Sequence, residues 1–451
     1  MPFNSPGFLF LLLPACLAFW LRPSIRWQHG VLLVASFVFY WFAGLRDLAT
    51  LLAIVGANYA LARYGAGQAA KVAAILLNLG VLAFYKYWPP VGAWIGLPLG
   101  ALVSGGIPLG ISFYVFQLIA YQVDRARGQV ETERSFTRLL LYVLFFPHHQ
   151  AGPIMKPGSF LPQFHSARVF NPVNVERGVV WILYGLCQKV LADQLAVKVT
   201  NAFASAPGSM VEAWTGAVCF AAQIYGDFAG YSNIAIGAGL LFGFQLDRNF
   251  NQPYLATSPS EFWARWHITL SAWLREYVYI PLGGNRRGPG RTFLNLMLTM
   301  TVGGLWHGAS WNFVLWGFLH GALLCLFRLL PLERLGRLVG WLVCQSAVLW
   351  LWVPFRAQGL SATLRHWSAM AGWHVPFGSK RQWLALALTV AAFLCAHAVE
   401  DCILGSEARL EQSSSLWSRL PSFLRGAVCA GVLLVAALFL LDKTTFIYFR
   451  F

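Results

Sequence analysis

Long apolar runs separated by short polar stretches fill the chain from its first residues. A helix needs about 20 apolar residues to cross a bilayer, and in lipid only helices and closed barrels satisfy their own backbone groups. We therefore expect an all-α polytopic membrane protein with about 11–12 transmembrane helices, plus re-entrant and interfacial helices. The expected spans are 7–21, 29–44, 48–62, 72–86, 107–123, 178–203, 214–243, 292–310, 312–328, 338–354, 382–399 and 425–441.

Lysine and arginine residues lie in loops that fall on alternate sides of these spans. Cytoplasmic loops are enriched in both residues, so this pattern places both termini outside the cytoplasm. Without an internal repeat or long linker, one membrane domain over residues 1–451 is the simplest interpretation. The basic loops hold Arg22 and Arg26, Arg63 and Lys71, Arg125 to Arg138, Arg248 to Arg291, and Arg328 to Arg337, whereas residues 89–106 and 205–212 are almost uncharged.

Composition narrows the class of protein further. Hydrophobic residues make up 58% of the chain and charged residues only 11%, with a mean hydropathy of +0.58, which excludes an ordinary soluble enzyme. The net charge of +16 is spread over separate loops rather than one polar domain, so we expect no nucleic-acid partner. The eight cysteines are far apart and form no Cys-x-x-Cys pair, so we expect packing roles and no metal site.

Residues 139–164 do not have the pattern of an ordinary span. Basic loops flank the segment on both sides, and its Pro147, Gly152 and Pro153 free backbone groups that protein or water must satisfy. A re-entrant hairpin entering from the cytoplasm fits this pattern best. His148 and His149 lie within it, and structural roles are at least as well supported for them as catalytic ones.

A second unusual segment begins with a strong helix start. Ser258 is placed as an N-cap, Pro259 as the first helical residue, and Glu261 as its capping-box partner, which can also pair with Arg265. We expect one helix at the cytoplasmic membrane surface. Its stripe at helical spacing is Trp266, Leu270, Trp273 and Tyr277.

The stretch between Arg291 and Arg328 holds about 36 residues without a charged side chain. As one helix it would measure about 54 Å against a hydrocarbon core of about 30 Å, so it must break and return near residues 308–312. His307 then lies about 24 Å along the helix from the cytoplasmic end. Intramembrane ionisable residues are functional candidates by default, and Gly317-x-x-x-Gly321 around His320 permits close helix packing. We expect His307 and His320 to share a contact only if the turn folds them together.

Several ordered motifs then carry a family resemblance. The sequence Arg-Trp-His-Ile-Thr-Leu-Ser at 265–271, Ile-Pro-Leu-Gly-Gly-Asn-Arg at 280–286 and Gly-Gly-Leu-Trp-His-Gly at 303–308 resembles the membrane-bound O-acyltransferase superfamily, in its bacterial alginate O-acetyltransferase branch. Further similarity lies at 108–114, 146–148, 151–154, 225–232 and 446–451. The resemblance therefore extends over nearly the whole chain.

The resemblance implies a transmembrane tunnel in which an acetyl group from a cytosolic thioester meets an extracytoplasmic acceptor. Acetyl-CoA is the expected thioester, and no bound cofactor is expected. His307 matches the family's catalytic histidine and His267 its second, cytoplasm-side histidine. A neutral imidazole can take the proton of an attacking hydroxyl. The other candidates are Trp306, Asn312, His320 and Asp227 for tunnel lining or positioning, with packing the alternative for Asp227, and Arg286, Arg287 and Arg291 for donor phosphates or membrane topology alone.

The aromatic tail resembles a segment that receives the acyl group on a tyrosine in related systems. Tyr448 is accordingly a candidate acyl carrier, and an interfacial anchor is the competing interpretation. The chain has no Gly-x-Ser-x-Gly elbow and no sizeable hydrophilic domain.

The absence of such a domain leads us to expect separate partners: a periplasmic acetyltransferase of the SGNH type and a polysaccharide synthase complex, in the lipids of the bacterial inner membrane. The expected product is an alginate-like or cellulose-like exopolysaccharide, because His149, Gln150 and Asn233 depart from the alginate pattern. A lipid or protein hydroxyl as acceptor, and a transporter or flippase, stay open as alternatives.

Overall fold

The computed structural model describes residues 3, 5–65, 67–96, 106–149, 152–330 and 336–404. Within these ranges all regular elements are helical. The chain divides into two compact units, the first formed by residues 1–185 and 231–248, the second by residues 186–230 and 249–451. Helices α9 (Pro172–Ala204) and α10 (Met210–Leu241) contribute residues to both units.

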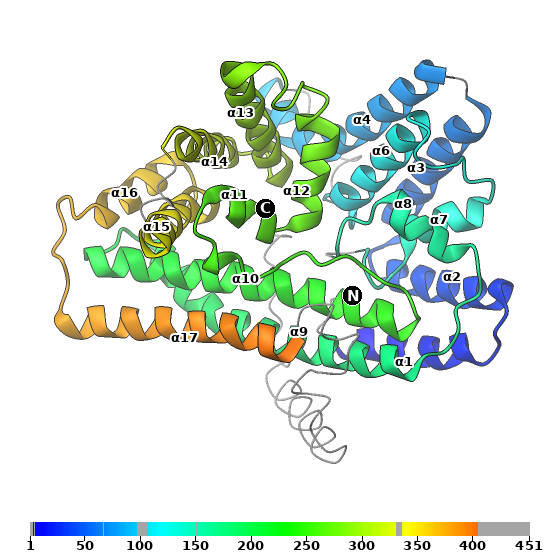
Figure 1. Cartoon of the computed structure of the whole chain (residues 1–451), viewed down its shortest axis with the longest axis horizontal. Coiled ribbons are helices and arrows are strands. Elements are labelled where there is room, and N and C mark those ends of the chain that lie inside the picture. Colours follow the sequence, from blue (N-terminus) through cyan, green and yellow to red (C-terminus); the bar gives the residue numbers. More distant parts are fainter. Residues whose placement is uncertain are drawn as a thin grey trace, which may run out of the picture. The chain divides into compact units, whose positions relative to one another are not determined.

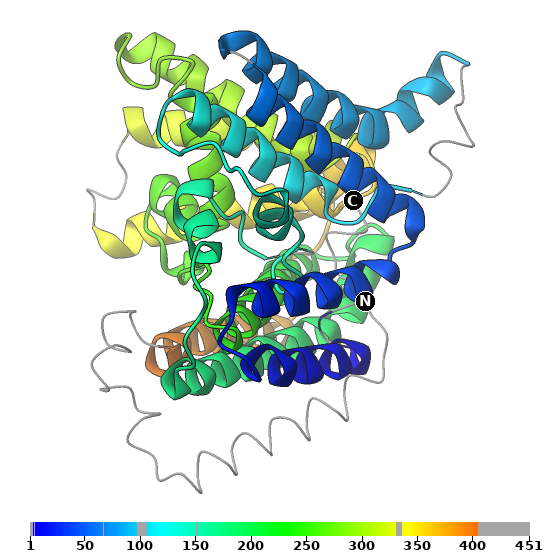
Figure 2. The same cartoon turned by 90° about the vertical axis from the view of Figure 1, so that its right-hand side faces the viewer.

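The first unit is built from apolar helices and a mostly non-helical connection. In Figures 1 and 2, α1 and α2 lie side by side, and α3, α4 and α6 run together. The short elements α7, α8 and η1 follow. Their bounds are α1 Pro6–Trp20, α2 Ile25–Trp41, α3 Leu45–Tyr64, α4 Gly67–Trp94, α6 Ile111–Ala126, α7 Phe136–Leu144, α8 Pro157–Phe160 and η1 Leu161–Phe164.

The connection after α7 shows how irregular backbone is accommodated in an apolar core. The ring of His148 donates from Nδ1 to the carbonyl of Phe145 at 2.7 Å and accepts from Gln117 Nε2 at 2.9 Å, while His149 Nδ1 donates to the Val143 carbonyl at 2.9 Å. Both buried histidines therefore have structural partners. The prediction that residues 139–164 do not form an ordinary span is confirmed. That this segment enters the membrane from the cytoplasm stays a prediction.

The second unit holds the longer C-terminal helices. Beside its parts of α9 and α10 it contains η2 Pro253–Leu255, α11 Pro259–Arg265, α12 Ile268–Leu274, η3 Arg275–Tyr279, α13 Gly288–His307, α14 Trp311–Leu329, α15 Arg337–Arg356, α16 Leu360–Met370 and α17 Lys380–Leu404. Helix α16 was not expected from the sequence.

Each expected span up to 382–399 corresponds to a helix, and span 425–441 lies outside the described residues. Five helices, α3, α4, α14, α15 and α17, are long and apolar enough to cross a membrane by length and composition. An all-α polytopic membrane protein is thus confirmed, while the total of 11–12 spans stays a prediction.

Helices α13 and α14 form a closely packed hairpin, and small residues explain the closeness. A Cβ atom on Gly304 would lie 2.2 Å from the Phe313 carbonyl oxygen, and one on Gly317 would lie 2.3 Å from the Met300 carbonyl oxygen. Glycines let helix backbones approach where side chains cannot. The predicted break is confirmed, because α13 ends at His307 and the Ser310 hydroxyl caps α14 by accepting from the Asn312 N–H.

Gly317→Ala is expected to lower the stability of the second unit by about 2 kcal/mol and to reduce activity, because the new methyl group forces α13 and α14 apart. Thermal unfolding in detergent and acyl-transfer rates would measure both effects. Gly290→Ala, in the first turn of α13, is the matched control, since nothing lies within 4 Å of its Cβ position. Equal stability of the two variants would contradict close packing at Gly317.

Candidate active site

A helix break at His267 corrects the prediction of one continuous helix along 258–277. Helix α11 ends at Arg265, and α12 starts at Ile268 after His267 adopts the left-handed conformation with φ of 42°. The stripe of Trp266, Leu270, Trp273 and Tyr277 is therefore not continuous. The N-terminal part of the prediction is confirmed, because Ser258 Oγ accepts from the Glu261 N–H.

The residues 249–258, here called the strap, supply the hydrogen bonds that the broken helix lacks. The Asn249 carbonyl accepts from the Ile268 N–H at 2.8 Å, and the Asn251 N–H donates to the Arg265 carbonyl at 2.9 Å. The Thr269 hydroxyl donates to the Asn249 side chain at 2.6 Å. These contacts are long-range in sequence, which explains why local periodicity predicted an unbroken helix.

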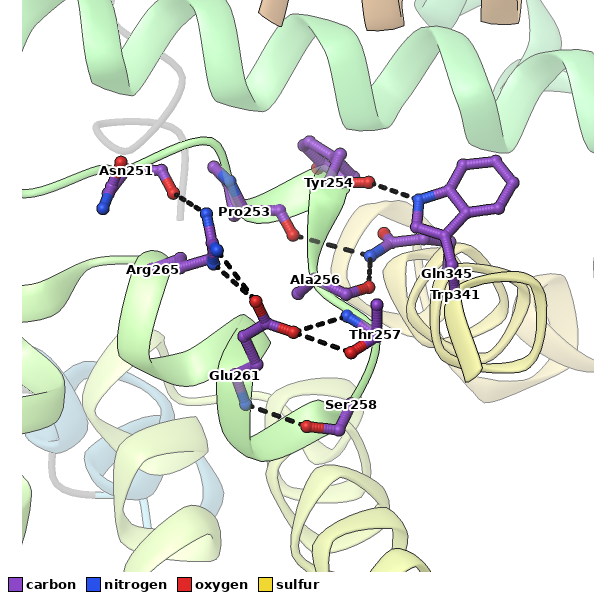
Figure 3. A network of polar contacts seen from close by, with 10 residues as sticks. All are labelled: Asn251, Pro253, Tyr254, Ala256, Thr257, Ser258, Glu261, Arg265, Trp341 and Gln345. Atoms are coloured by element: carbon purple, nitrogen blue, oxygen red, sulfur yellow. Dashed lines mark hydrogen bonds and ion pairs between the residues drawn. The ribbon is translucent and has the colours of Figure 1, made fainter. Parts of the chain in front are cut away.

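The strap is fixed on its other side by α11 and α15 (Figure 3). Glu261 accepts from the Thr257 N–H at 2.7 Å and from Arg265 at 2.8 Å, so the predicted Glu261–Arg265 pair is confirmed. On α15, Gln345 donates to the Ala256 carbonyl at 2.7 Å and Trp341 to the Tyr254 carbonyl at 2.9 Å. Burial raises the pKa of Glu261, but hydrogen bonds from Thr257 and Arg265 outweigh it and lower that pKa overall.

His307 is the last residue of α13 and is 7% exposed. Its ring is surrounded by Trp306 at 4.8 Å, Trp316 at 5.2 Å, Phe355 at 5.0 Å and Phe313 at 6.2 Å between centroids. This aromatic enclosure excludes water from the imidazole and holds the ring. An imidazole enclosed in this way interacts strongly with any charge that develops beside it.

Trp306 connects the two candidate catalytic histidines. Its ring centroid lies 6.0 Å from that of His267 and 4.8 Å from that of His307. His267 is fully buried, and neither of its ring nitrogens has a hydrogen-bond partner among the described residues. The structure thus brings His267 together with Trp306 and His307, which lie on a separate segment of the sequence.

His320 and His307 both contact the ring of Trp316. The ring of Trp316 is 5.2 Å from His307 and 4.8 Å from His320. The two histidines therefore share Trp316 as a neighbour, and contact of both with one reacting atom stays untested. Trp316 itself was missed by sequence reasoning, although it lies four residues before His320 on the same helix face.

The side-chain amide of Asn312 is hydrogen-bonded to backbone and side-chain groups of α15 and α16. Its Nδ2 group donates to the carbonyls of Pro354 at 3.0 Å and Ala357 at 2.8 Å, where α15 ends, and to the Thr363 hydroxyl at 3.3 Å. These contacts tie the start of α14 to α15 and α16. The Oδ1 atom of Asn312 has no partner in the described part of the chain. Only this atom of the side-chain amide is therefore available to position a substrate.

Asp227 belongs to a buried charge cluster. Lys189 on α9 contacts Asp227 on α10 at 2.8 Å and also bonds Asp193 one helical turn along. The Lys189 and Asp227 side chains are 1% and 4% exposed. This geometry supports a packing role for Asp227 rather than tunnel lining. Lys189 was missed, although a lysine inside an expected span signals a partner of opposite charge.

The three candidate donor-binding arginines are exposed at the start of α13. Arg286, Arg287 and Arg291 form no ion pair with any described residue. The preceding turn is held by Asn295, whose Nδ2 donates to the Gly284 carbonyl at 3.0 Å. The guanidinium groups are therefore accessible to an anionic ligand. Tyr448, the candidate acyl carrier, lies outside the described residues.

The comparisons with known proteins identify the family. The family model of membrane-bound O-acyltransferases matches residues 108–332, which include His267, His307 and His320. The chain is 37% identical over 426 residues to the Azotobacter vinelandii protein named "Probable alginate O-acetylase AlgI", covering 88% of this chain and 84% of that one. The chain belongs to the membrane-bound O-acyltransferase family. Membership makes this multi-pass membrane protein an acyltransferase and sets aside the transporter alternative.

Other relatives of this membrane-bound O-acyltransferase are named for different acceptor polymers. The Helicobacter pylori "Peptidoglycan O-acetyltransferase" is 32% identical over 427 residues, with 82% of this chain and 80% of that protein covered. The Bacillus subtilis "Teichoic acid D-alanyltransferase" is 24% identical over 247 residues, with 52% of this chain and 62% of that protein covered. The names of these relatives thus refer to alginate, peptidoglycan and teichoic acid.

Proposed function

We propose that this acyltransferase moves acetyl from acetyl-CoA, bound at the cytoplasmic face of the bacterial inner membrane, to a hydroxyl group on the other side. The observation that carries the proposal is the enclosure of His307 and His267 around one ring, Trp306, on the two broken helices of the second unit. Two imidazoles reached from different segments suit a reaction in which donor and acceptor arrive separately.

The chemistry follows from a neutral imidazole in an apolar enclosure. His307 accepts the proton of the acceptor hydroxyl, whose oxygen then forms a bond to the thioester carbonyl carbon. The carbon–sulfur bond breaks and the thiolate leaves. It takes a proton from the imidazolium of His307 directly or through His267, so the reaction has no net proton uptake. Exclusion of water by the surrounding rings limits hydrolysis of the thioester.

Donor binding is assigned to the exposed arginines at the start of α13. A nucleotide donor carries several phosphate groups, and arginine binds phosphate through paired N–H donors. Arg286 and Arg287 directly precede α13, and Arg291 lies in the first turn of this helix, which ends in His307. One element therefore holds candidate binding groups at one end and the candidate base at the other.

The acceptor is proposed to be an exopolysaccharide, alginate-like or cellulose-like, reached through a periplasmic acetyltransferase of the SGNH type that works with a polysaccharide synthase complex. Relatives named for alginate and peptidoglycan support a sugar hydroxyl as the final acceptor. Tyr448 is proposed to carry acetyl between His307 and the periplasmic enzyme. A hydroxyl of a lipid or protein is the second candidate acceptor.

Inverted membrane vesicles, with the cytoplasmic face outward, test this proposal. Acetyl-CoA labelled in its acetyl group is added outside, and labelled acetyl ester is measured inside on polymer co-produced with the periplasmic partner. We expect label on the polymer in vesicles that contain the protein and none in vesicles that lack it. Transfer only to acceptor added outside would contradict movement across the membrane. With Tyr448→Phe, unchanged polymer labelling would exclude the carrier role and leave the acyltransferase itself intact.

A further inference from the structure

Three aromatic rings form a mutually contacting triangle, and one of them, Trp316, also contacts His307. Trp263 on α11 lies 5.7 Å from Trp316 and 5.1 Å from His320, both on α14, and Trp316 lies 4.8 Å from His320 between ring centroids. Trp316 and His320 are each 1% exposed. The triangle joins the helix that precedes the His267 break to the helix that follows the His307 break.

The four ring nitrogens of this triangle have no hydrogen-bond partner within the described part of the chain. Nε1 of Trp263, Nε1 of Trp316, and both Nδ1 and Nε2 of His320 are buried without a hydrogen bond to any described residue. The rings touch one another, yet no nitrogen bonds its neighbour. Buried polar groups in proteins nearly always have partners, so several unpartnered atoms in one small volume indicate a ligand.

The donors and acceptors of the triangle define the chemistry of that ligand. Two indole groups can only donate, and a neutral imidazole donates from one nitrogen and accepts at the other, which gives three N–H donors and one acceptor. Arg265, the cation nearest in sequence to Trp263, is already paired with Glu261. A site rich in neutral donors suits an uncharged oxygen acceptor such as a carbonyl, rather than a phosphate.

We propose that Trp263, Trp316 and His320 bind the carbonyl oxygen of the acyl donor and hold its carbonyl carbon beside His307. The inference rests on the proposed function, because it takes the donor to be a thioester. Trp316 contacts His307 at 5.2 Å, so an oxygen held by its N–H group lies next to the base that activates the hydroxyl. The same donors face the negative charge that develops on this oxygen during attack.

Two non-reactive donor analogues test the carbonyl contact by binding alone. S-(2-oxopropyl)-CoA keeps a carbonyl group and S-propyl-CoA has a methylene in its place. We expect wild-type protein to bind the oxo analogue about five- to tenfold more tightly, the worth of one or two neutral hydrogen bonds. In Trp316→Phe and in Trp263→Phe this preference is expected to fall toward one, with S-propyl-CoA affinity unchanged. Calorimetry in detergent measures each ratio.

Two further variants separate the contact from packing. Replacing Trp316 by β-(3-benzothienyl)alanine keeps the ring shape and removes only the N–H group, so it should also abolish the preference. Trp352→Phe is the control, because the Trp352 N–H already donates to the Tyr254 hydroxyl at 3.1 Å and its loss should leave the ratio intact. If the Trp316 and Trp263 variants still prefer the oxo analogue over S-propyl-CoA, the carbonyl site is overturned, while the proposed donor is not affected. Failure of wild-type protein to bind either analogue overturns the proposed donor as well.

Discussion

His307→Ala is expected to lower the rate of acetyl transfer by about a thousandfold, because a positioned general base contributes about 10²- to 10⁴-fold to such reactions. The imidazole is enclosed by Trp306, Trp316 and Phe355, so water cannot easily replace it as the base. The measurement is the initial rate with labelled acetyl-CoA, referred to the amount of folded protein that elutes as a single species in detergent.

His366→Asn provides the matched control for this prediction. His366 is a buried histidine of the same unit, but its Nε2 group bonds the Ala213 carbonyl at 3.0 Å and its ring stacks on Phe203 at 4.4 Å. We expect this variant to lose some stability and to keep its rate per folded molecule. An active His307→Ala protein, correctly inserted and folded, would remove the basis for the proposed enzyme mechanism.

Lys189→Met is expected to lower the free energy of unfolding by about 3–5 kcal/mol, because removing one partner of a buried ion pair leaves an uncompensated buried charge. Lys189 is fully buried and contacts both Asp193 and Asp227. Without it, the buried Asp227 carboxylate loses its ion pair with Lys189. Unfolding of the purified protein in mixed micelles, followed by tryptophan fluorescence, measures the change.

Asp227→Asn is expected to cost less, because Lys189 keeps its pair with Asp193. Combining Lys189→Met with Asp227→Asn should recover part of the loss, since the double variant no longer buries the Asp227 charge, and a double-mutant cycle gives the coupling. Unchanged stability in Lys189→Met would contradict the ion pair. Loss of acetyl transfer at unchanged stability would assign the cluster to the reaction path instead.

Features that depend on neighbours along the chain could be predicted from the sequence. The cap at Ser258, the Glu261–Arg265 pair and the break after His307 follow from short-range rules of helix capping, charge spacing and span length. The close approach at Gly317 likewise follows from the spacing of small residues. The cap and the ion pair join residues three and four positions apart, and Gly317 meets the helix that directly precedes its own across a short turn.

The break at His267 could not be predicted in this way. No glycine or proline marks it, and the apolar stripe continues through it at helical spacing. The break exists because Asn249 and Asn251 of the strap supply hydrogen bonds to Ile268 and Arg265. A left-handed residue without glycine costs free energy, and distant contacts hold it in place.

The sequence by itself determined that this is an all-helical membrane protein, and which family its ordered motifs resemble, because apolar length and motif order are properties of the chain alone. Only the tertiary structure decided which side chains share the site. Trp306 between His267 and His307, Trp263 against Trp316 and His320, and Lys189 against Asp227 each join separate helices. Such pairings depend on how helices pack in three dimensions, and local periodicity says which face of a helix is apolar but not which helix covers it.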